Sequence, residues 1–239
     1  MAIVFGFAGD VKDYHTLCHD RQRFAALLST VRPDRCPRCG EPDSCILWGS
    51  YRRWAYLTTE HLPVRIERVR CVLCGASHAL LPSCLHVHRR YALAVIQQAI
   101  VVAVETGVSG DRLANAVAPY NQPVVTTLHE WVRSFLHGAQ CLLAWLQPTL
   151  TSQAPLTCLD PGPQPAYLAR RRPSARTTAL RHAWLCLRLA EALYAAHRTI
   201  YPHLVFHFDV LFAFLTLALQ TVGWTPRLLW RNPPPRAPD

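Results

Sequence analysis

CPRCG at residues 36–40 and CVLCG at residues 71–75 decide the fold of the first part of this chain. Each motif places two cysteines on a tight turn, where a glycine accepts a positive φ and backbone amides point at sulfur. Tetrahedral Zn²⁺ needs this arrangement twice, and four thiolates leave no position for a reactive water molecule. We therefore expect one structural Zn²⁺ per chain, although two disulfides, a redox pair or unrelated thiols are alternatives. The predicted ligands are Cys36, Cys39, Cys71 and Cys74.

The residues between the two motifs favour a β-hairpin. ILWGSYRRWAYL at 46–57 and HLPVRIERVR at 61–70 are rich in strand-forming residues, and apolar and charged residues alternate in the second stretch. Residues 58–60 form the expected turn. The hairpin would return the second cysteine motif to the side of the first, which predicts a zinc ribbon over residues 35–90.

After Pro82 the sequence changes to long helical patterns. The predicted helices cover residues 91–104, 111–118, 123–146, 178–198 and 202–222. Six prolines and no periodicity mark the segment 147–177 as a linker. The predicted domains are an N-terminal leader (1–34), the zinc ribbon (35–90), a helix-turn-helix-like region (91–146), the proline-rich linker (147–177), a C-terminal helical pair (178–224) and a disordered tail (225–239).

The charge balance favours a polyanionic partner. The chain has 25 basic and 15 acidic residues and a formal net charge of +10, which suits nucleic acid. Lys12 is the only lysine, and arginine pairs bidentately with phosphate or guanine. A GC-rich genome produces the same excess of arginine, so composition leaves both explanations open.

The N-terminus and the apolar segments bear on localisation. MAIVFGFAGD at 1–10 lacks the basic region of a secretory signal. The longest apolar runs, 99–104 and 210–219, are shorter than the roughly 18 residues of a membrane span. We expect a cytoplasmic protein that does not cross a membrane.

A helix-turn-helix candidate lies within residues 106–135. Ser109 or Asp111 can cap a short helix that buries apolar residues, and a second helix begins at Pro123 with Val124 among its buried positions. The polar side of the second helix suits contacts with phosphates and base edges. The predicted DNA contacts on it are Thr126, Thr127, His129 and Arg133. An ordinary amphipathic helix pair is the alternative.

Arginines on the predicted hairpin offer a second DNA contact. If they share one side of the two strands, they form one basic face. These residues are Arg52, Arg53, Arg65 and Arg68.

Further cysteine and histidine residues near the ribbon are candidate ligands for a second metal ion. They are Cys45, Cys84, His86 and His88. Residues of these types more often pack or form hydrogen bonds than bind metal.

The two cysteine motifs, Arg68 and Arg70 before the second motif, and HALLP at 78–82 together resemble a known pattern. Residues 35–146 resemble the N-terminal zinc ribbon and helix-turn-helix region of bacterial insertion-sequence transposases. They resemble more closely a transposase-related bacterial family of unknown function. The resemblance implies DNA binding in a mobile-element context.

The chain departs from complete transposases at its C-terminal end. Those enzymes hold two divalent metals with three carboxylates on an RNase H-like domain, and residues 147–239 are too short for one. The acids left there are Asp160, Glu191, Asp209 and Asp239. We therefore expect no catalytic domain.

The predicted fold is a small β zinc ribbon followed by a mainly α-helical domain with two C-terminal apolar helices. The predicted function is binding of double-stranded DNA with a structural zinc ion, with a homodimer formed through the apolar helices. The alternatives are a transposase fragment with strand-transfer or nuclease activity, and a zinc-ribbon module for protein interaction or oligomerisation.

Overall fold

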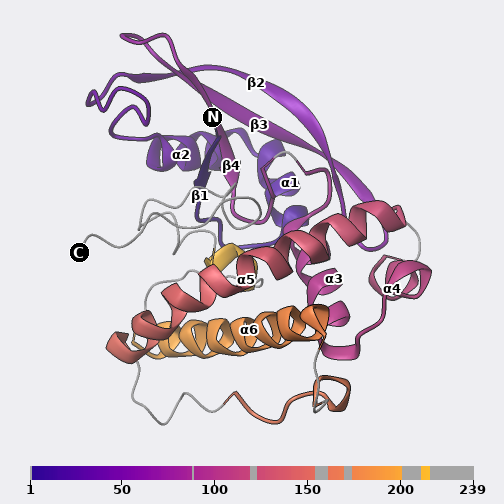
Figure 1. The fold of residues 1–239 in the computed structure, drawn as a ribbon. Helices are drawn as coiled ribbons and strands as arrows, with labels where there is room; N and C mark the ends of the chain where they lie inside the picture. Colours follow the sequence, from indigo (N-terminus) through magenta and orange to yellow (C-terminus); the bar gives the residue numbers. More distant parts are fainter. Residues whose placement is uncertain are drawn as a thin grey trace.

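A mixed β-sheet with two helices forms one layer of the protein, and longer helices form a second layer below it in Figure 1. The computed structural model describes residues 2–87, 89–118, 123–153, 161–169, 174–200 and 211–215. The side chains of 150–153 and 197–200 are outside this description.

The sheet has the strand order β1 (Ala2–Phe5), β4 (Ser77–Pro82), β3 (His61–Cys71), β2 (Cys45–Tyr56). The predicted hairpin is confirmed, because β2 and β3 pair antiparallel from Cys45 opposite Cys71 to Tyr56 opposite His61. The backbone N–H of Leu57 donates to the carbonyl of Glu60 at 2.8 Å and closes the turn. β4 adds to β3 antiparallel, and β1 adds to β4 in parallel.

Residues 1–34, predicted as a leader, contribute β1 and two helices to the sheet layer. These are α1 (Val11–His19) and α2 (Arg21–Val31). Asp10 caps α1 through a capping box, and the side chain of Asp20 caps α2. The hydroxyl of buried Tyr14 donates to the carbonyl of Arg65 at 2.9 Å, which fastens α1 to β3. Strand β1 was not predicted, because its four residues pair only with a strand distant in sequence.

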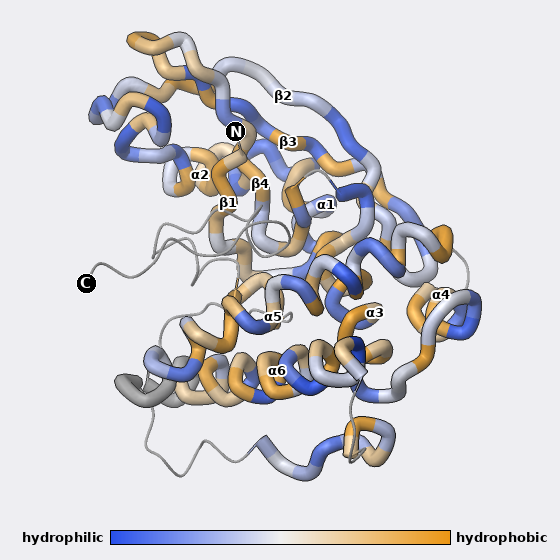
Figure 2. The backbone as a smooth tube through the Cα atoms, in the orientation of Figure 1, coloured by the Kyte–Doolittle hydropathy of each residue, from blue (hydrophilic) through white to orange (hydrophobic). Residues whose placement is uncertain are grey.

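The second layer contains α3 (Leu93–Thr106), α4 (Gly110–Val117), α5 (Val125–Gln153), η2 (Ala166–Leu168) and α6 (Ala175–Ile200). Helices α5 and α6 lie side by side over much of their length. Figure 2 shows hydrophobic and hydrophilic residues alternating along both. Their apolar stripes supply much of the core of this layer.

Two helix boundaries differ from the prediction by three residues or more. Helix α5 continues past residue 146 to Gln153 with Pro148 inside it. A proline removes one backbone donor from a helix, and here the Thr149 hydroxyl donates to the carbonyl of Trp145 at 2.7 Å. Helix α6 begins at Ala175, before the predicted residue 178, because Ser174 accepts a hydrogen bond from the backbone N–H of Thr177 at 3.2 Å.

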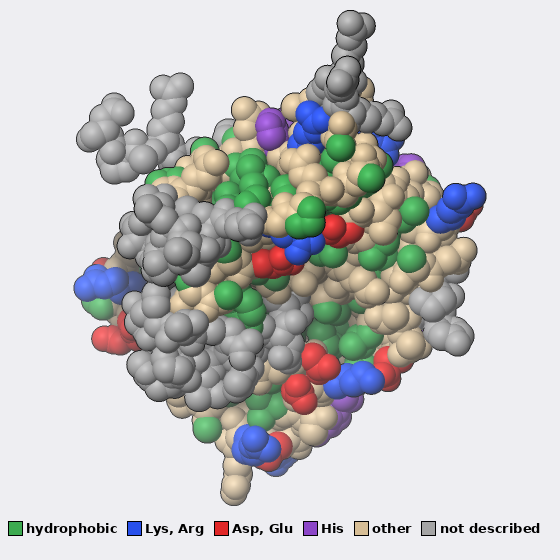
Figure 3. All heavy atoms as spheres, turned by 90° about the horizontal axis from the view of Figure 1, so that it is seen from below, with side chains coloured by type: hydrophobic (Ala, Val, Ile, Leu, Met, Phe, Trp, Pro, Cys, Tyr) green, Lys and Arg blue, Asp and Glu red, His purple; other side chains and the backbone are tan. Residues whose placement is uncertain are grey.

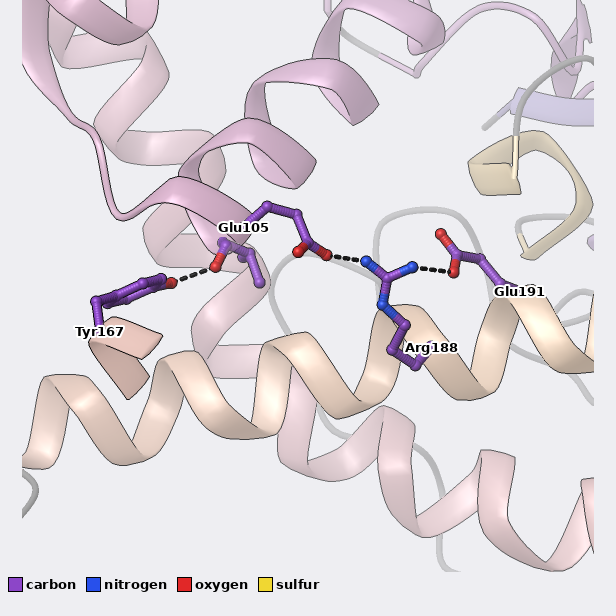
Figure 4. A network of polar contacts seen from close by, with 5 residues as sticks. Glu105, Tyr167, Arg188 and Glu191 are labelled. Atoms are coloured by element: carbon purple, nitrogen blue, oxygen red, sulfur yellow. Dashed lines mark hydrogen bonds and ion pairs between the residues drawn. The ribbon is translucent and has the colours of Figure 1, made fainter. Parts of the chain in front are cut away.

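Part of the predicted linker packs on the helices. The hydroxyl of Tyr167 donates to the carbonyl of Val104, and Arg181 donates to the carbonyl of Leu168 at 2.6 and 2.8 Å. On the same side of α3, Arg188 contacts Glu105 and, at 2.7 Å, Glu191 (Figure 4). The short helix η2 is therefore held against α3 and α6.

The last predicted helix, 202–222, is described only at residues 211–215. This segment is helical and buried within the same chain. The Phe212 ring stacks on Phe135 of α5 at 5.5 Å, and the Phe212 N–H donates to Oε1 of Gln97 at 2.8 Å. The predicted tail, 225–239, lies outside the described residues, and no described helix is long and apolar enough to cross a membrane.

Aromatic rings connect the two layers. Trp54 contacts His61, His61 stacks with Tyr56, Tyr56 contacts Tyr91, and Tyr91 meets Trp131 of α5, with centroid separations of 5.0 to 5.5 Å. The N–H of Tyr56 donates to the carbonyl of Arg90 at 2.8 Å. Arg89 pairs with Glu130 of α5 at 2.7 Å.

The helical core predicts a large cost for truncating Phe135. This ring is buried and stacked on Phe212, so Phe135→Ala should lower the free energy of unfolding by about 3 to 5 kcal/mol. Val124→Ala is the control, because Val124 is 66% exposed and should change it by less than about 0.5 kcal/mol. Urea denaturation measures both, and equal effects would contradict the described packing of α5.

Candidate metal centre

The two cysteine motifs fold into turns with the same backbone hydrogen bonds. Gly40 N–H donates to the carbonyl of Cys36 at 2.8 Å, and Gly75 N–H donates to that of Cys71 at 3.0 Å. Both glycines adopt positive φ angles, 76° and 69°, which residues with a Cβ rarely adopt. Cys36 and Cys71 also donate their N–H groups to the carbonyls of the residues five positions later, both at 2.9 Å.

The turns bring four sulfur atoms to one point. The ligand atoms of Cys36, Cys39, Cys71 and Cys74 all lie within 4.8 Å of one another. The Cys36–Cys74 and Cys39–Cys71 sulfur separations are both 3.7 Å. A tetrahedral Zn²⁺ with Zn–S bonds of about 2.3 Å separates its sulfurs by about 3.8 Å. The cluster can therefore hold a metal ion, and its dimensions suit zinc.

Hydrogen bonds prepare two of the sulfurs to be thiolates. A hydrogen bond with the Ser44 side chain, followed by one from the backbone N–H of Cys74, lowers the pKa of Cys71 to about 6. Backbone N–H groups of Cys39 and Arg38 likewise lower the pKa of Cys36. Thiolates are the metal-binding form of cysteine.

Crowding acts in the opposite direction on Cys39. A backbone hydrogen bond at Glu41 lowers its pKa, but partial desolvation of this exposed thiol and the three neighbouring cysteine side chains outweigh this and raise it to about 12. Four thiolates at these distances repel one another unless a cation lies between them. The site therefore favours a bound cation over an empty, fully ionised cluster.

Two residues around the cluster orient its sulfurs. Ser44 Oγ lies 3.3 Å from Cys71 Sγ, and Nε2 of His78, a residue only 1% exposed, lies 3.6 Å from Cys36 Sγ. Burial lowers the pKa of His78, so a neutral imidazole can donate Nε2–H to sulfur. His78 begins the HALLP stretch noted in the sequence, but nothing in the sequence indicated Ser44, which the start of β2 brings to Cys71.

No second metal-binding group occurs among the described residues. Cys45 is buried opposite Cys71 in the hairpin. Burial raises the pKa of Cys84, which disfavours its thiolate. His86 Nδ1 lies 2.6 Å from the carbonyl of Val87, and His88 lies outside the described residues.

The four hairpin arginines do not share one basic face. Arg52 and Arg65 lie opposite each other across β2 and β3, and the alternation of side chains places Arg53 and Arg68 on the other face. Arg53 is half-buried and donates to the carbonyls of His86, at 3.2 Å, and Arg89. Arg65 pairs with Glu67 at 2.5 Å and lies over the Phe24 ring. Arg52 and Arg68 are exposed.

The predicted contacts on α5 lie in its first turns. Thr126, His129 and Arg133 line a cavity of about 580 Å³ between α5, the α3–α4 connection and the start of α6, which Arg176 also lines. Thr127 is half-buried and outside this lining. These side chains therefore border a hollow.

The helices before and at this cavity match the predicted pattern in part. Helix α4 buries Leu113, Ala114 and Val117 as expected, but Ser109 at its N-cap makes no side-chain capping bond. Val124, predicted to be buried, is exposed, because α5 begins only at Val125. The residues between α4 and α5 include 119–122, which lie outside the described residues, so the helix-turn-helix geometry stays a prediction.

A similarity to known proteins is found over strands β2 to β4 and helices α3 and α4. Residues 36–120 match the family model of a domain of unknown function, DUF6431. The matched segment contains all four clustered cysteines and ends before α5. No curated protein and no solved structure matches the chain. The match carries no link to transposases, so that relationship also stays a prediction.

Loss of one cluster cysteine should abolish metal binding. Cys71→Ser removes a thiolate that the Ser44 hydrogen bond favours, so purified protein should lose at least about 90% of its zinc, since structural zinc requires all four ligands. Cys141→Ser on α5 is the control, because Cys141 is outside the cluster. Elemental analysis measures zinc per chain, and equal zinc in both variants would contradict the assignment.

Removing the metal should loosen the cysteine end of the hairpin first. Without a cation the thiolates repel, so a strong chelator should reduce hydrogen-exchange protection in residues 36–47 and 69–78. Helices α5 and α6 pack mainly on each other and on α3 and α4 and should keep their protection. Exchange followed by mass spectrometry tests this, and uniform loss of protection would show that the metal supports the whole chain.

Proposed function

We propose that this protein binds double-stranded DNA and uses one structural Zn²⁺ to hold the end of its β-hairpin. The observation that carries the proposal is the position of the four-cysteine cluster at the end of strands that bear exposed arginines. Cys45 and Cys71 are opposite each other where the pairing of β2 and β3 begins, and this end of the hairpin lies at the cluster. Arg52 and Arg68 lie farther along the same two strands and are exposed.

A structural role for the metal follows from its ligands. Four cysteine sulfurs complete the coordination sphere of zinc, which leaves no position for an activated water molecule. The metal would then act by cross-linking residues 36–39 to residues 71–74.

The charge of the chain supports a nucleic-acid partner. Its formal net charge is +10, and neither Arg52 nor Arg68 has an ion pair with a described residue. Arg133 and Arg176 line the cavity at the start of α5. Arg52 and Arg68 lie on opposite faces of the hairpin, so duplex phosphates would contact Arg52 there, with α5 as the second contact region.

We assign no catalytic activity to this chain, and we propose that the chain is related to the N-terminal regions of transposases. Of the acids that a strand-transfer site would need, Glu191 pairs with Arg188 at 2.7 Å, and Asp160 and Asp209 lie outside the described residues. A transposase fragment with nuclease or strand-transfer activity is the competing function. Metal-dependent cleavage or joining of DNA ends that Asp209→Ala abolishes would establish that function in place of ours.

Salt dependence provides the test of DNA binding. Affinity for duplex DNA should fall steeply as salt rises, because binding releases counterions from the phosphates. Arg52→Ala and Arg133→Ala should each weaken binding to all sequences similarly and reduce the salt slope by about 1. Fluorescence anisotropy with the zinc-loaded chain at several salt concentrations measures both quantities.

Arg23→Ala is the matched control, because Arg23 is an exposed arginine that lies on α2 and belongs to neither proposed contact region. It should leave the affinity and the salt slope unchanged. Salt-independent binding, or equal effects of all three substitutions, would refute the proposal.

A further inference from the structure

Strand β2 exposes large aromatic side chains along the edge of the sheet. Trp48 is 56% exposed, Tyr51 is 42% exposed and Trp54 is 51% exposed. β2 is the last strand in the sheet order, so β3 is its one partner among the described strands, apart from a bridge between Tyr56 and Tyr91 at its end. Large rings are usually buried in a domain that has no partner, and their exposure on one strand therefore indicates a binding surface.

Two of these rings lie on one face of the hairpin with two arginines. Side chains alternate along β3, so Arg68 and Arg70 share a face. The Arg70 guanidinium lies 4.6 Å from the centre of the Trp48 ring, which places Trp48 on that face. Tyr51 is opposite Ile66. Ile66 lies two residues before Arg68 on β3, so the side chains of Tyr51, Ile66 and Arg68 point to the same face. We call Trp48, Tyr51, Arg68 and Arg70 the aromatic–arginine surface.

The surface is open between its two rings. Gly49 lies opposite Arg68 in the strand register, and no atom beyond its chain neighbours Trp48 and Ser50 lies within 4 Å of where a side chain on Gly49 would begin. Arg70 covers part of Trp48, whose exposure leaves the rest of the indole free. Trp48 and Tyr51, each about half exposed, therefore both offer surface to a planar group.

The positive charge of the surface is not balanced locally. The acids of the hairpin are engaged elsewhere, because Glu60 pairs with Lys12 at 2.6 Å and Glu67 pairs with Arg65 at 2.5 Å. Arg68 forms no ion pair with any described residue. The helical end of the molecule differs, because acidic and basic side chains lie next to one another there (Figure 3).

Exposed rings beside uncompensated arginines match the chemistry of an unpaired nucleotide chain. Its bases offer flat faces that stack on tryptophan and tyrosine, and its phosphates pair with guanidinium groups. A duplex hides the faces of its bases inside the helix. A second copy of this protein would bring the same arginines and repel the first.

We propose that the aromatic–arginine surface binds single-stranded nucleic acid, with bases stacked on Trp48 and Tyr51 and a phosphate at Arg68. Arg70 supports the Trp48 ring from behind. This inference rests on the proposed nucleic-acid function and deepens it, because it assigns unpaired strands to the hairpin edge.

The test compares single strands with a duplex. The zinc-loaded full chain is titrated against labelled oligo(dT), oligo(U) and a mixed-sequence duplex, each of about 12 nucleotides or base pairs. The variant Trp48→Ala/Tyr51→Ala should bind the single strands at least about tenfold more weakly and the duplex within about twofold of the unmodified chain. The oligo(dT) and oligo(U) arms show whether DNA or RNA is preferred.

Two further variants separate stacking from misfolding. Trp48→Phe/Tyr51→Phe keeps both rings and should retain single-strand affinity within about threefold. Trp54→Ala removes an equally exposed ring from the opposite face of the same strand and should have no effect. All variants should keep the zinc content of the unmodified chain, which confirms that the hairpin is folded.

The outcomes distinguish the two proposals. Duplex binding without single-strand binding, or single-strand affinity that the double alanine variant leaves unchanged, overturns this inference and leaves the proposed function standing. Failure of the unmodified chain to bind any of the three probes overturns both. A dimer that the double alanine variant converts to a monomer, measured by light scattering, would assign the surface to a second copy and overturn the inference.

Discussion

The repulsion among four thiolates that lie within 4.8 Å of one another is the constraint on which the sheet layer depends. A cation between the sulfurs converts that repulsion into a cross-link between two turns far apart in sequence. The cross-link lies at one end of the β2–β3 hairpin, where Cys45 pairs with Cys71. Ser44 and His78 contact two of the sulfurs, so metal binding also couples to β2 and β4.

The other end of the hairpin is held by packing and hydrogen bonds. Rings from Trp54 through Tyr91 to Trp131 connect the strands to α5, and the backbone of Tyr56 pairs with residues 90–92. The hairpin is therefore fixed at both ends by different physics, coordination at one and aromatic packing at the other. The stretch of β2 between them keeps its edge and its rings exposed.

Some arginines of the hairpin make contacts within the protein, and others are exposed to solvent. Arg53 turns inward, and burial lowers its pKa, while its guanidinium satisfies carbonyls of the segment after β4. Arg65 is neutralised by Glu67. Arg52 and Arg68 stay available to a ligand on opposite faces. The number of arginines on the two strands therefore overstates the positive charge that a partner would meet, because two of the four make contacts within the fold.

The sequence alone determined the features that depend on neighbouring residues. The spacing of the cysteines and the glycine after each pair predicted the cluster, and alternation predicted the hairpin. The apolar period predicted α3 to α6, although α5 continues past its predicted end to Gln153. Only the tertiary structure decided what depends on distant contacts: the parallel strand β1, the approach of Ser44 to Cys71, and the face on which each arginine lies. Local patterns encode turns and periodicity, whereas these features are set by which surfaces meet when the chain buries its apolar groups.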